Sequence, residues 1–159
     1  MTSTAPLPSA STTVVPPVRI ASIPDAAPEN YRAMHALSRS VRLDDELRQL
    51  IDIRVSQING CAFCLKFHLS VARKAGVPQE KLDLLAAWRD AGLFSARERA
   101  ALAYAEAMTE LEPGAASDDA WASLRAEFSE DEALHLTVTV AGINAWNRIA
   151  IGLSFAPPA

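Results

Sequence analysis

Apolar residues recur every three or four positions through most of the chain, which is the spacing of one face of an α-helix. Between Pro28 and Val41 this spacing selects Tyr31, Met34 and Leu37. The same pattern, bounded by capping and breaking residues, predicts six to seven helices, over residues 28–41, 44–58, 61–76, 78–90, 95–112, 117–128 and 130–153. No segment is predicted to be a strand.

Capping residues support several of the predicted helix starts. Ser95 with Glu98, and Ser129 with Glu132, form capping-box patterns in front of two of the helices. The β-branched run 137–140 lies inside a longer helical pattern, so its strand propensity is expected to be overridden. The predicted fold class is therefore all-α, packed as a helical bundle.

Composition indicates one helical domain behind a mobile tail. The chain has 159 residues, of which 50% are hydrophobic and 21% charged, enough for one domain with a core. Residues 1–18 are rich in Ser, Thr, Ala and Pro, and we expect them to form a mobile tail without a secretory signal. The domain is predicted over residues 19–159. Its most apolar window, 134–153, contains two asparagines and an arginine, so it is interpreted as a buried helix and not as a membrane span.

The net charge of the chain indicates which classes of partner it can bind. A formal net charge of -4 provides no basic field, so neither nucleic acid nor an anionic membrane is an expected partner. A cytoplasmic location is expected. The Ala-rich helices have few strongly polar faces, which favours burial of surface against copies of the same chain, so we expect a homo-oligomer.

Both cysteines of the chain lie in the segment Cys61-Ala62-Phe63-Cys64, and His68 follows four residues after the second cysteine. In a helix, positions i, i+3 and i+7 share one face, which would bring both thiols and the imidazole together. Two cysteines three apart close too short a loop for a structural staple, so a reversible dithiol/disulfide pair is favoured. An imidazole beside such a pair can move protons near neutral pH, which indicates redox chemistry on a small oxidant.

The spacing also suggests different roles for the two thiols. His68 is one helical turn from Cys64 and two turns from Cys61, so only Cys64 is expected to reach it, directly or through one water. We therefore favour Cys64 as the attacking thiolate and Cys61 as the resolving thiol, although the helix N-terminus favours a thiolate at Cys61. The expected cycle is attack on a peroxide, a sulfenic acid at Cys64, and a disulfide that an external dithiol reduces.

Two other interpretations of the cysteine pair stay open. The cysteines could be small buried apolar residues, or they could bind zinc with His35 or His135 as a further ligand. Neither explains two cysteines and a histidine on one face as well as redox chemistry does. No metal or bound cofactor is expected.

Segment 54–64 reads RVSQINGCAFC, and His68 follows it. In these residues the chain resembles the alkylhydroperoxidase D-like (AhpD-like) branch of the carboxymuconolactone decarboxylase family. That branch is known for the pattern E-x11-C-x2-C-x3-H. The resemblance covers residues 43–110 well, and segment 143–150 is similar to the end of single-core members. It implies an all-helical fold, a homo-oligomer, often a trimer or a trimer of dimers, and thiol-dependent reduction of hydroperoxides. It also implies a peroxidatic second cysteine, a resolving first cysteine and a proton relay through His68.

One position departs from the family pattern. Its glutamate falls on Gln49, which can orient a water or the imidazole of His68 but cannot accept and return a proton at neutral pH. Glu46 and Asp52 lie one turn to either side on the same helix, so each could lie near the site, and Glu46 is included with Gln49 among the predicted site residues. Some members carry a further relay histidine where this chain has Phe63, which is expected to pack or to shape an apolar mouth for an organic peroxide.

The sequence leaves two alternatives to a peroxidase. One is decarboxylation of a muconolactone, against which the dithiol argues, because the decarboxylase branch typically works without one. The other is a redox-sensing protein whose cysteine pair oxidises without turnover. For the peroxidase, the expected reductant is a small dithiol or a lipoyl- or thioredoxin-type protein.

Overall fold

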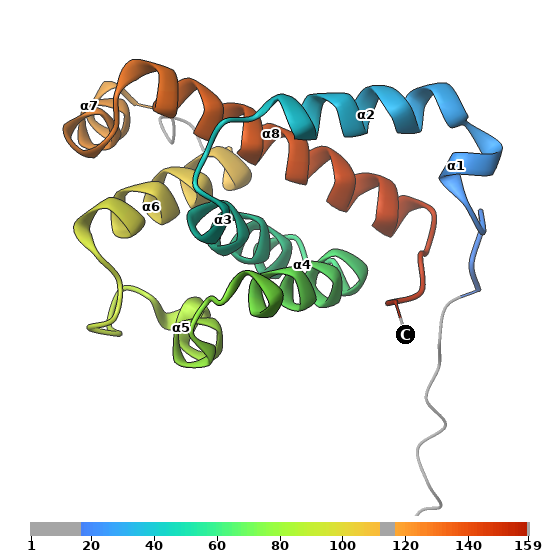
Figure 1. Cartoon of the computed structure of the whole chain (residues 1–159), viewed down its shortest axis with the longest axis horizontal. Coiled ribbons are helices and arrows are strands. Elements are labelled where there is room, and N and C mark those ends of the chain that lie inside the picture. Colours follow the sequence, from blue (N-terminus) through green and yellow to red (C-terminus); the bar gives the residue numbers. More distant parts are fainter. Residues whose placement is uncertain (1–16, 112–116, 159) are drawn as a thin grey trace, which may run out of the picture.

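The computed structural model of the protein describes residues 17–111 and 117–158, and within these ranges the chain is helical and contains no strand. Figure 1 shows the elements, which are α1 (Ile23–Ala26), α2 (Pro28–Ser40), α3 (Asp45–Ile58), α4 (Ala62–Ala75), α5 (Gln79–Leu84), the 3-10 helix η1 (Leu85–Ala87), α6 (Ala96–Glu110), α7 (Asp118–Glu127) and α8 (Glu130–Gly152). The predicted all-α fold class is confirmed. Each predicted helix has a counterpart in the structure.

Most helix ends follow from local hydrogen bonding. The Asp44 carboxylate accepts the backbone N–H of Leu47 at 3.0 Å and so caps α3. The predicted capping boxes at Ser95 and Ser129 are both formed, at the starts of α6 and α8. Gly76 ends α4 with a left-handed backbone, φ 88°, which glycine adopts without the steric cost of a Cβ. These ends depend on near neighbours in sequence, which is why the sequence pattern predicted them.

Two elements differ from the prediction. The helix predicted over residues 78–90 is shorter, because α5 ends at Leu84 and the chain continues as the 3-10 turn η1. Leu82, Leu85 and Trp88 are all buried. They are three residues apart, and a 3-10 turn keeps positions at this interval on one face. Helix α1 was not predicted, because a single turn is too short to show helical periodicity.

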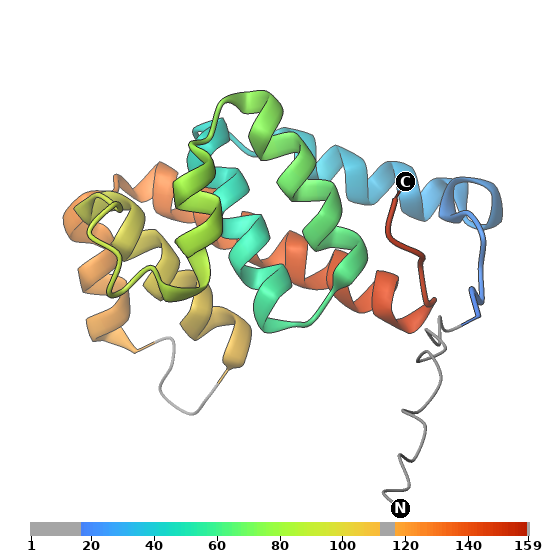
Figure 2. The same cartoon turned by 90° about the horizontal axis from the view of Figure 1, so that it is seen from below.

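Helix α3 is central and packs against α4, α6 and α8. Figures 1 and 2 show α2 alongside α8, and α3 followed by α4 across a short turn. Apolar side chains of α3 belong to two buried clusters. The first cluster includes side chains of α6, α7 and α8, and the second includes side chains of α4, α5, η1 and α6. The buried residues of α3 also include the polar side chains Gln49, Asp52 and Ser56. These buried polar residues indicate where a functional site is built.

The two ends of the described chain are joined to each other. The backbone N–H of Arg19 donates to the carbonyl of Leu153 at 3.0 Å, and its guanidinium donates to the carbonyl of Gly152 at 2.7 Å. The predicted mobile tail over residues 1–18 lies outside the described residues, apart from its last two. Among the helices that are described, none is both long and apolar enough to cross a membrane.

Candidate functional site

A tight turn between α3 and α4 sets the position of the first cysteine. Gly60 has φ 66°, a left-handed conformation that reverses the chain directly after Asn59. The Asn59 amide donates to the side-chain oxygens of Asn144 and Asn147 on α8, at 2.9 Å each. Cys61 then caps α4, and its sulfur accepts the backbone N–H of Cys64 at 3.5 Å. The turn that carries Cys61 is thereby fixed to α8.

Both thiols are free and almost fully buried, with 2% of Cys61 and 5% of Cys64 exposed. A hydrogen bond from the Cys64 thiol lowers the pKa of Cys61 to about 6, and the backbone N–H groups of Cys64 and Phe63 act in the same direction. The same hydrogen bond, together with burial, raises the pKa of Cys64. Near neutral pH the pair therefore holds a thiolate at Cys61 and a proton at Cys64. These shifts favour ionisation of Cys61 over Cys64, and the role of attacking thiol that the sequence suggests for Cys64 stays a prediction.

His68 is held by Gln49, the residue that departs from the family pattern. The Nδ1 atom of His68 lies 2.9 Å from the Gln49 side-chain carbonyl oxygen, which can only accept, so Nδ1 carries the proton. Burial lowers the pKa of His68 to about 4, and the nearby positive charge of Arg48 adds to this shift. The imidazole is consequently neutral at pH 7. Its Nε2 atom is left able to accept a proton.

Asp52 supplies a carboxylate beside the same histidine. Its Oδ2 atom lies 3.4 Å from Nδ1 of His68 and 3.7 Å from Nε of Arg48. Burial raises the pKa of Asp52 to about 7, and the charge of Arg48 partly opposes this shift. A carboxyl group with such a pKa can accept and return a proton near neutrality. The residue that can exchange protons with His68 thus lies one helical turn after Gln49.

The structure does not bring Glu46 to the dithiol. Its carboxylate pairs with Lys81 at 3.1 Å, and 40% of its side chain is exposed. Lys81 also pairs with Glu98, so Glu46 belongs to a small ion-pair network between α3, α5 and α6. Of the two acidic neighbours of Gln49 in the sequence, Asp52 is the one in contact with His68.

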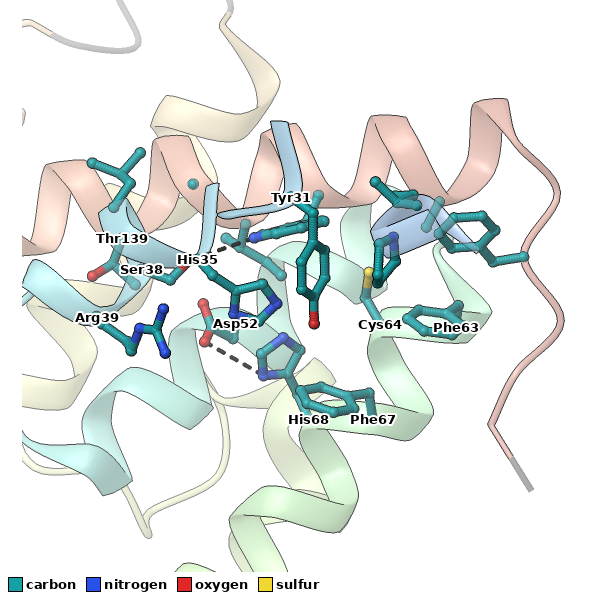
Figure 3. A pocket seen from close by; sticks show the side chains of 18 of the residues that line it. Tyr31, His35, Ser38, Arg39, Asp52, Phe63, Cys64, Phe67, His68 and Thr139 are labelled. Carbon is teal, nitrogen blue, oxygen red and sulfur yellow. Dashed lines mark hydrogen bonds and ion pairs between the residues drawn. The ribbon is translucent and has the colours of Figure 1, made fainter. Parts of the chain in front are cut away.

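A cavity of about 760 Å³ opens beside Cys64, bounded mainly by α2, α4 and α8. Figure 3 shows Cys64, His68 and Asp52 among the side chains that line it. Aromatic rings contribute much of the remaining wall, from Tyr31, His35, Phe63, Phe67, Trp146 and Phe155. Cys61 instead borders a separate pocket of about 230 Å³, formed by the start of α4 and residues 150–157. Of the two cysteines, Cys64 thus lines the larger pocket and Cys61 the smaller one.

The other two histidines make different contacts, although His35 lines the same cavity as His68. The ring of His35 packs against Tyr31 and Trp146, with centroids 4.2 and 5.5 Å away. His135 lies on α8, where its Nε2 is 3.7 Å from Asp131. Within the described ranges, no three His, Cys, Asp or Glu side chains are arranged to hold a metal ion. The zinc interpretation therefore finds no ligand set in this part of the chain.

Sequence reasoning missed the asparagines of α8. Asn147 is fully buried, and it joins α8 to α3 by donating to Ser56 at 3.1 Å and accepting from Asn59. Its side chain also hydrogen-bonds to both cysteines, which lowers the pKa of each thiol. Asn144 and Asn147 lie in the apolar window 134–153, where the sequence indicated only that this helix does not span a membrane. A buried amide in such a window is also a signal of a polar network.

Three comparisons place the chain among known proteins. The carboxymuconolactone decarboxylase family model matches residues 26–107. YdfG of Bacillus subtilis (strain 168), an uncharacterised protein, is 34% identical over 132 residues, which cover 81% of this chain and 90% of YdfG. ATU0492 of Agrobacterium tumefaciens, solved as a protein of unknown function and suggested to be an antioxidant defence protein AhpD, is 37% identical with a TM-score of 0.85. That match covers 90% of this chain and 99% of ATU0492.

A further solved structure is an uncharacterised peroxidase-related protein of Silicibacter sp. TM1040. It is 25% identical to this chain with a TM-score of 0.73, and the match covers 82% of this chain and 71% of the other. The similarity thus extends over most of the helical part of the chain, including the segment with both cysteines.

Proposed function

The chain belongs to the carboxymuconolactone decarboxylase family, in its AhpD-like branch, and from this membership and the site geometry we propose that it is a thiol-dependent peroxidase. In the proposed reaction, Cys61 and Cys64 reduce a hydroperoxide to an alcohol and water and are oxidised to a disulfide. One observation carries the proposal: Cys64, the cavity-facing member of a free dithiol, shares its cavity with His68.

The first step is attack by Cys64 on the peroxide. Nε2 of His68 takes the thiol proton, and the sulfur attacks the terminal oxygen of the hydroperoxide. An S–O bond forms as the O–O bond breaks, and the departing alkoxide takes the proton from the imidazolium to become an alcohol. Gln49 holds the ring in orientation, and the Asp52 carboxylate stabilises the imidazolium while it exists. Cys64 is left as a sulfenic acid.

The second step closes the disulfide. The thiolate of Cys61 attacks the sulfur of the Cys64 sulfenic acid, and an S–S bond forms as the S–O bond breaks. The hydroxide that leaves takes a proton from the solvent and departs as water. The lowered pKa of Cys61 suits it to this resolving role, because it is already ionised when the sulfenic acid forms.

The third step restores the dithiol. An external dithiol gives two electrons by thiol–disulfide exchange, through a mixed disulfide, and leaves as its own disulfide. The reductant that we propose is a lipoyl- or thioredoxin-type dithiol. We also propose that the working form is a homo-oligomer, a trimer or a hexamer.

Steady-state consumption of cumene hydroperoxide, with lipoyl-type and thioredoxin-type reductants supplied side by side, tests the proposal. Turnover with at least one reductant is expected, and the Cys64→Ser variant should show none. Oxidation of the dithiol without turnover would instead indicate a redox sensor. Loss of a muconolactone's absorbance, with no peroxide consumed, would indicate the decarboxylase chemistry of the family.

A further inference from the structure

We propose that the cavity beside Cys64 selects a bulky, apolar hydroperoxide that carries a carboxylate, and that Arg39 and Arg48 bind this carboxylate. The proposal rests on the peroxidase function and names the substrate class of the same site. In the reaction, the substrate's O–O bond is cleaved as described above, and its carboxylate takes no part in the electron transfer.

The size of the cavity argues for a bulky substrate. Its volume of about 760 Å³ lies within the range of pockets that enclose whole organic ligands, roughly 300–1,000 Å³. Hydrogen peroxide would fill only a small part of this space. The walls are largely apolar and include Tyr31, Trp146 and Ile143. Figure 3 shows Phe63 near Cys64. An apolar substrate body is therefore expected to displace water from most of the cavity.

Two arginines line one end of this cavity, and one of them, Arg48, has a buried hydrogen-bond donor without a partner among the described residues. Nε of Arg48 is shielded from solvent and has no hydrogen-bond partner among the described residues. Its nearest carboxylate oxygen, on Asp52, is 3.7 Å away, beyond hydrogen-bond distance. Arg39 also lines the cavity, and Figure 3 shows it on the same side as Asp52. A buried donor without an acceptor is costly, so this end of the cavity favours a ligand that supplies one.

The charges around the cavity favour an anionic group in particular. Among the described residues that line it, Asp52 alone is acidic, against the two guanidinium groups. Burial raises the pKa of Asp52 to about 7, so near neutral pH its carboxyl group is only partly ionised. The net charge at this end is therefore positive. A carboxylate matches the fork of a guanidinium with two parallel hydrogen bonds, which makes it the ligand group that these side chains fit.

A matched pair of substrates tests the proposal. Linoleate hydroperoxide and its methyl ester have the same peroxide group and apolar chain, and only the acid is charged. The ratio of kcat/KM for acid over ester, measured below the micelle concentration, is compared between the wild type and Arg39→Gln. We expect the ratio to fall at least about tenfold in the variant, the lower limit for a hydrogen bond between charged groups. Effects of solubility, or of a change common to both substrates, cancel in this comparison.

Arg32→Gln is the control, because it removes the same charge from the same helix. Arg32 does not line the cavity, and 71% of its side chain is exposed next to Glu29. Its ratio of acid to ester should equal that of the wild type. An equal ratio in the wild type and in Arg39→Gln would overturn the proposal.

A binding measurement separates this proposal from the peroxidase function. The alcohols formed from the acid and the ester are titrated into the reduced protein by calorimetry. Binding of the hydroxy acid at least about tenfold tighter than its ester, lost in Arg39→Gln, would support the carboxylate site even if no peroxide were consumed. Peroxide turnover combined with equal binding of acid and ester would leave the peroxidase function standing and reject the carboxylate site.

Discussion

The side-chain oxygen of Gln49 lies 2.9 Å from Nδ1 of His68 and accepts its proton, and a carboxylate oxygen of the buried Asp52 lies 3.4 Å from the same nitrogen. In the family pattern a glutamate stands at position 49. We propose that orientation and proton exchange are divided between two residues in this chain, since an amide can orient the ring but cannot ionise. The division leads to a test in which the carboxylate is moved from one position to the other.

The first prediction concerns that exchange. Asp52→Asn should lower the rate of dithiol oxidation by cumene hydroperoxide about 10²-fold, the lower end of general acid–base assistance. Gln49→Glu in the same chain should restore much of the loss, because it returns a carboxylate to the family position. Gln49→Glu alone should change the rate less, since Asp52 is already present. Stopped-flow measurements over a range of pH decide the outcome. An Asp52→Asn variant as fast as the wild type, or a double variant as slow as Asp52→Asn, would contradict this division of roles.

A second prediction follows from the raised pKa of Asp52. Its carboxyl has a pKa of about 7 in the folded chain and 3.8 as the reference value, so between these pH values the folded state binds more protons than the unfolded state. Stability from this group is therefore lost as the pH rises through the interval. As the pH rises through this interval, the free energy of unfolding of Asp52→Asn should increase relative to that of the wild type by up to about 1.4 kcal/mol per pH unit. Urea unfolding from pH 4 to 8 measures the difference. A difference that does not change with pH would contradict a buried, neutral Asp52.

Sequence reasoning reached part of this site and not the rest. Cys61, Cys64 and His68 were found because their spacing is local to one helix. Glu46 and Asp52 could not be separated, since both lie one turn from Gln49 and the choice depends on how α4 packs against α3. In the structure Lys81, from another helix, binds Glu46, while His68 approaches Asp52. These contacts join residues that are far apart in sequence, so no local pattern could reveal them.

At the scale of elements, α8 clamps the turn between α3 and α4. Asn147 accepts from Asn59 at 2.9 Å and donates to Ser56 at 3.1 Å, and Asn144 also accepts from Asn59. The sequence predicted α8 as a buried helix from its apolar pattern. It did not predict the clamp, because the partners of a buried amide depend on which helices meet.

The third prediction concerns this clamp. Asn147→Ala leaves the Asn59 amide and the Ser56 hydroxyl short of a partner, so it should cost about 2–3 kcal/mol of stability. It should also raise the pKa of the dithiol, because the Asn147 side chain lowers the pKa of both thiols. Urea unfolding and the pH dependence of thiolate absorbance measure the two effects. Asn30→Ala, at an exposed position of α2, is the control and should change neither. A loss of stability with an unchanged thiol pKa would limit Asn147 to a structural role.

For the whole molecule, we propose that several copies of the chain assemble. Large apolar side chains are exposed on three helices, with Leu37 on α2, Trp121 on α7 and Leu134 on α8. Burial of such groups against further copies would remove apolar surface from water. The fourth prediction is a mass by light scattering several times 17.1 kDa at micromolar concentration. A monomer at that concentration would contradict it.

The proposed peroxidase cycle depends on a single turnover at Cys64, and one experiment observes this turnover directly. The reduced protein is mixed with one equivalent of cumene hydroperoxide, without reductant, and the products are followed by mass spectrometry. We predict one cumyl alcohol per chain and a Cys61–Cys64 disulfide. In Cys61→Ser the sulfenic acid should persist at Cys64, where dimedone traps it, whereas Cys64→Ser should leave the peroxide unreduced. Unchanged peroxide with the wild-type dithiol, or a dimedone adduct at Cys61 in Cys64→Ser with none at Cys64 in Cys61→Ser, would contradict the account.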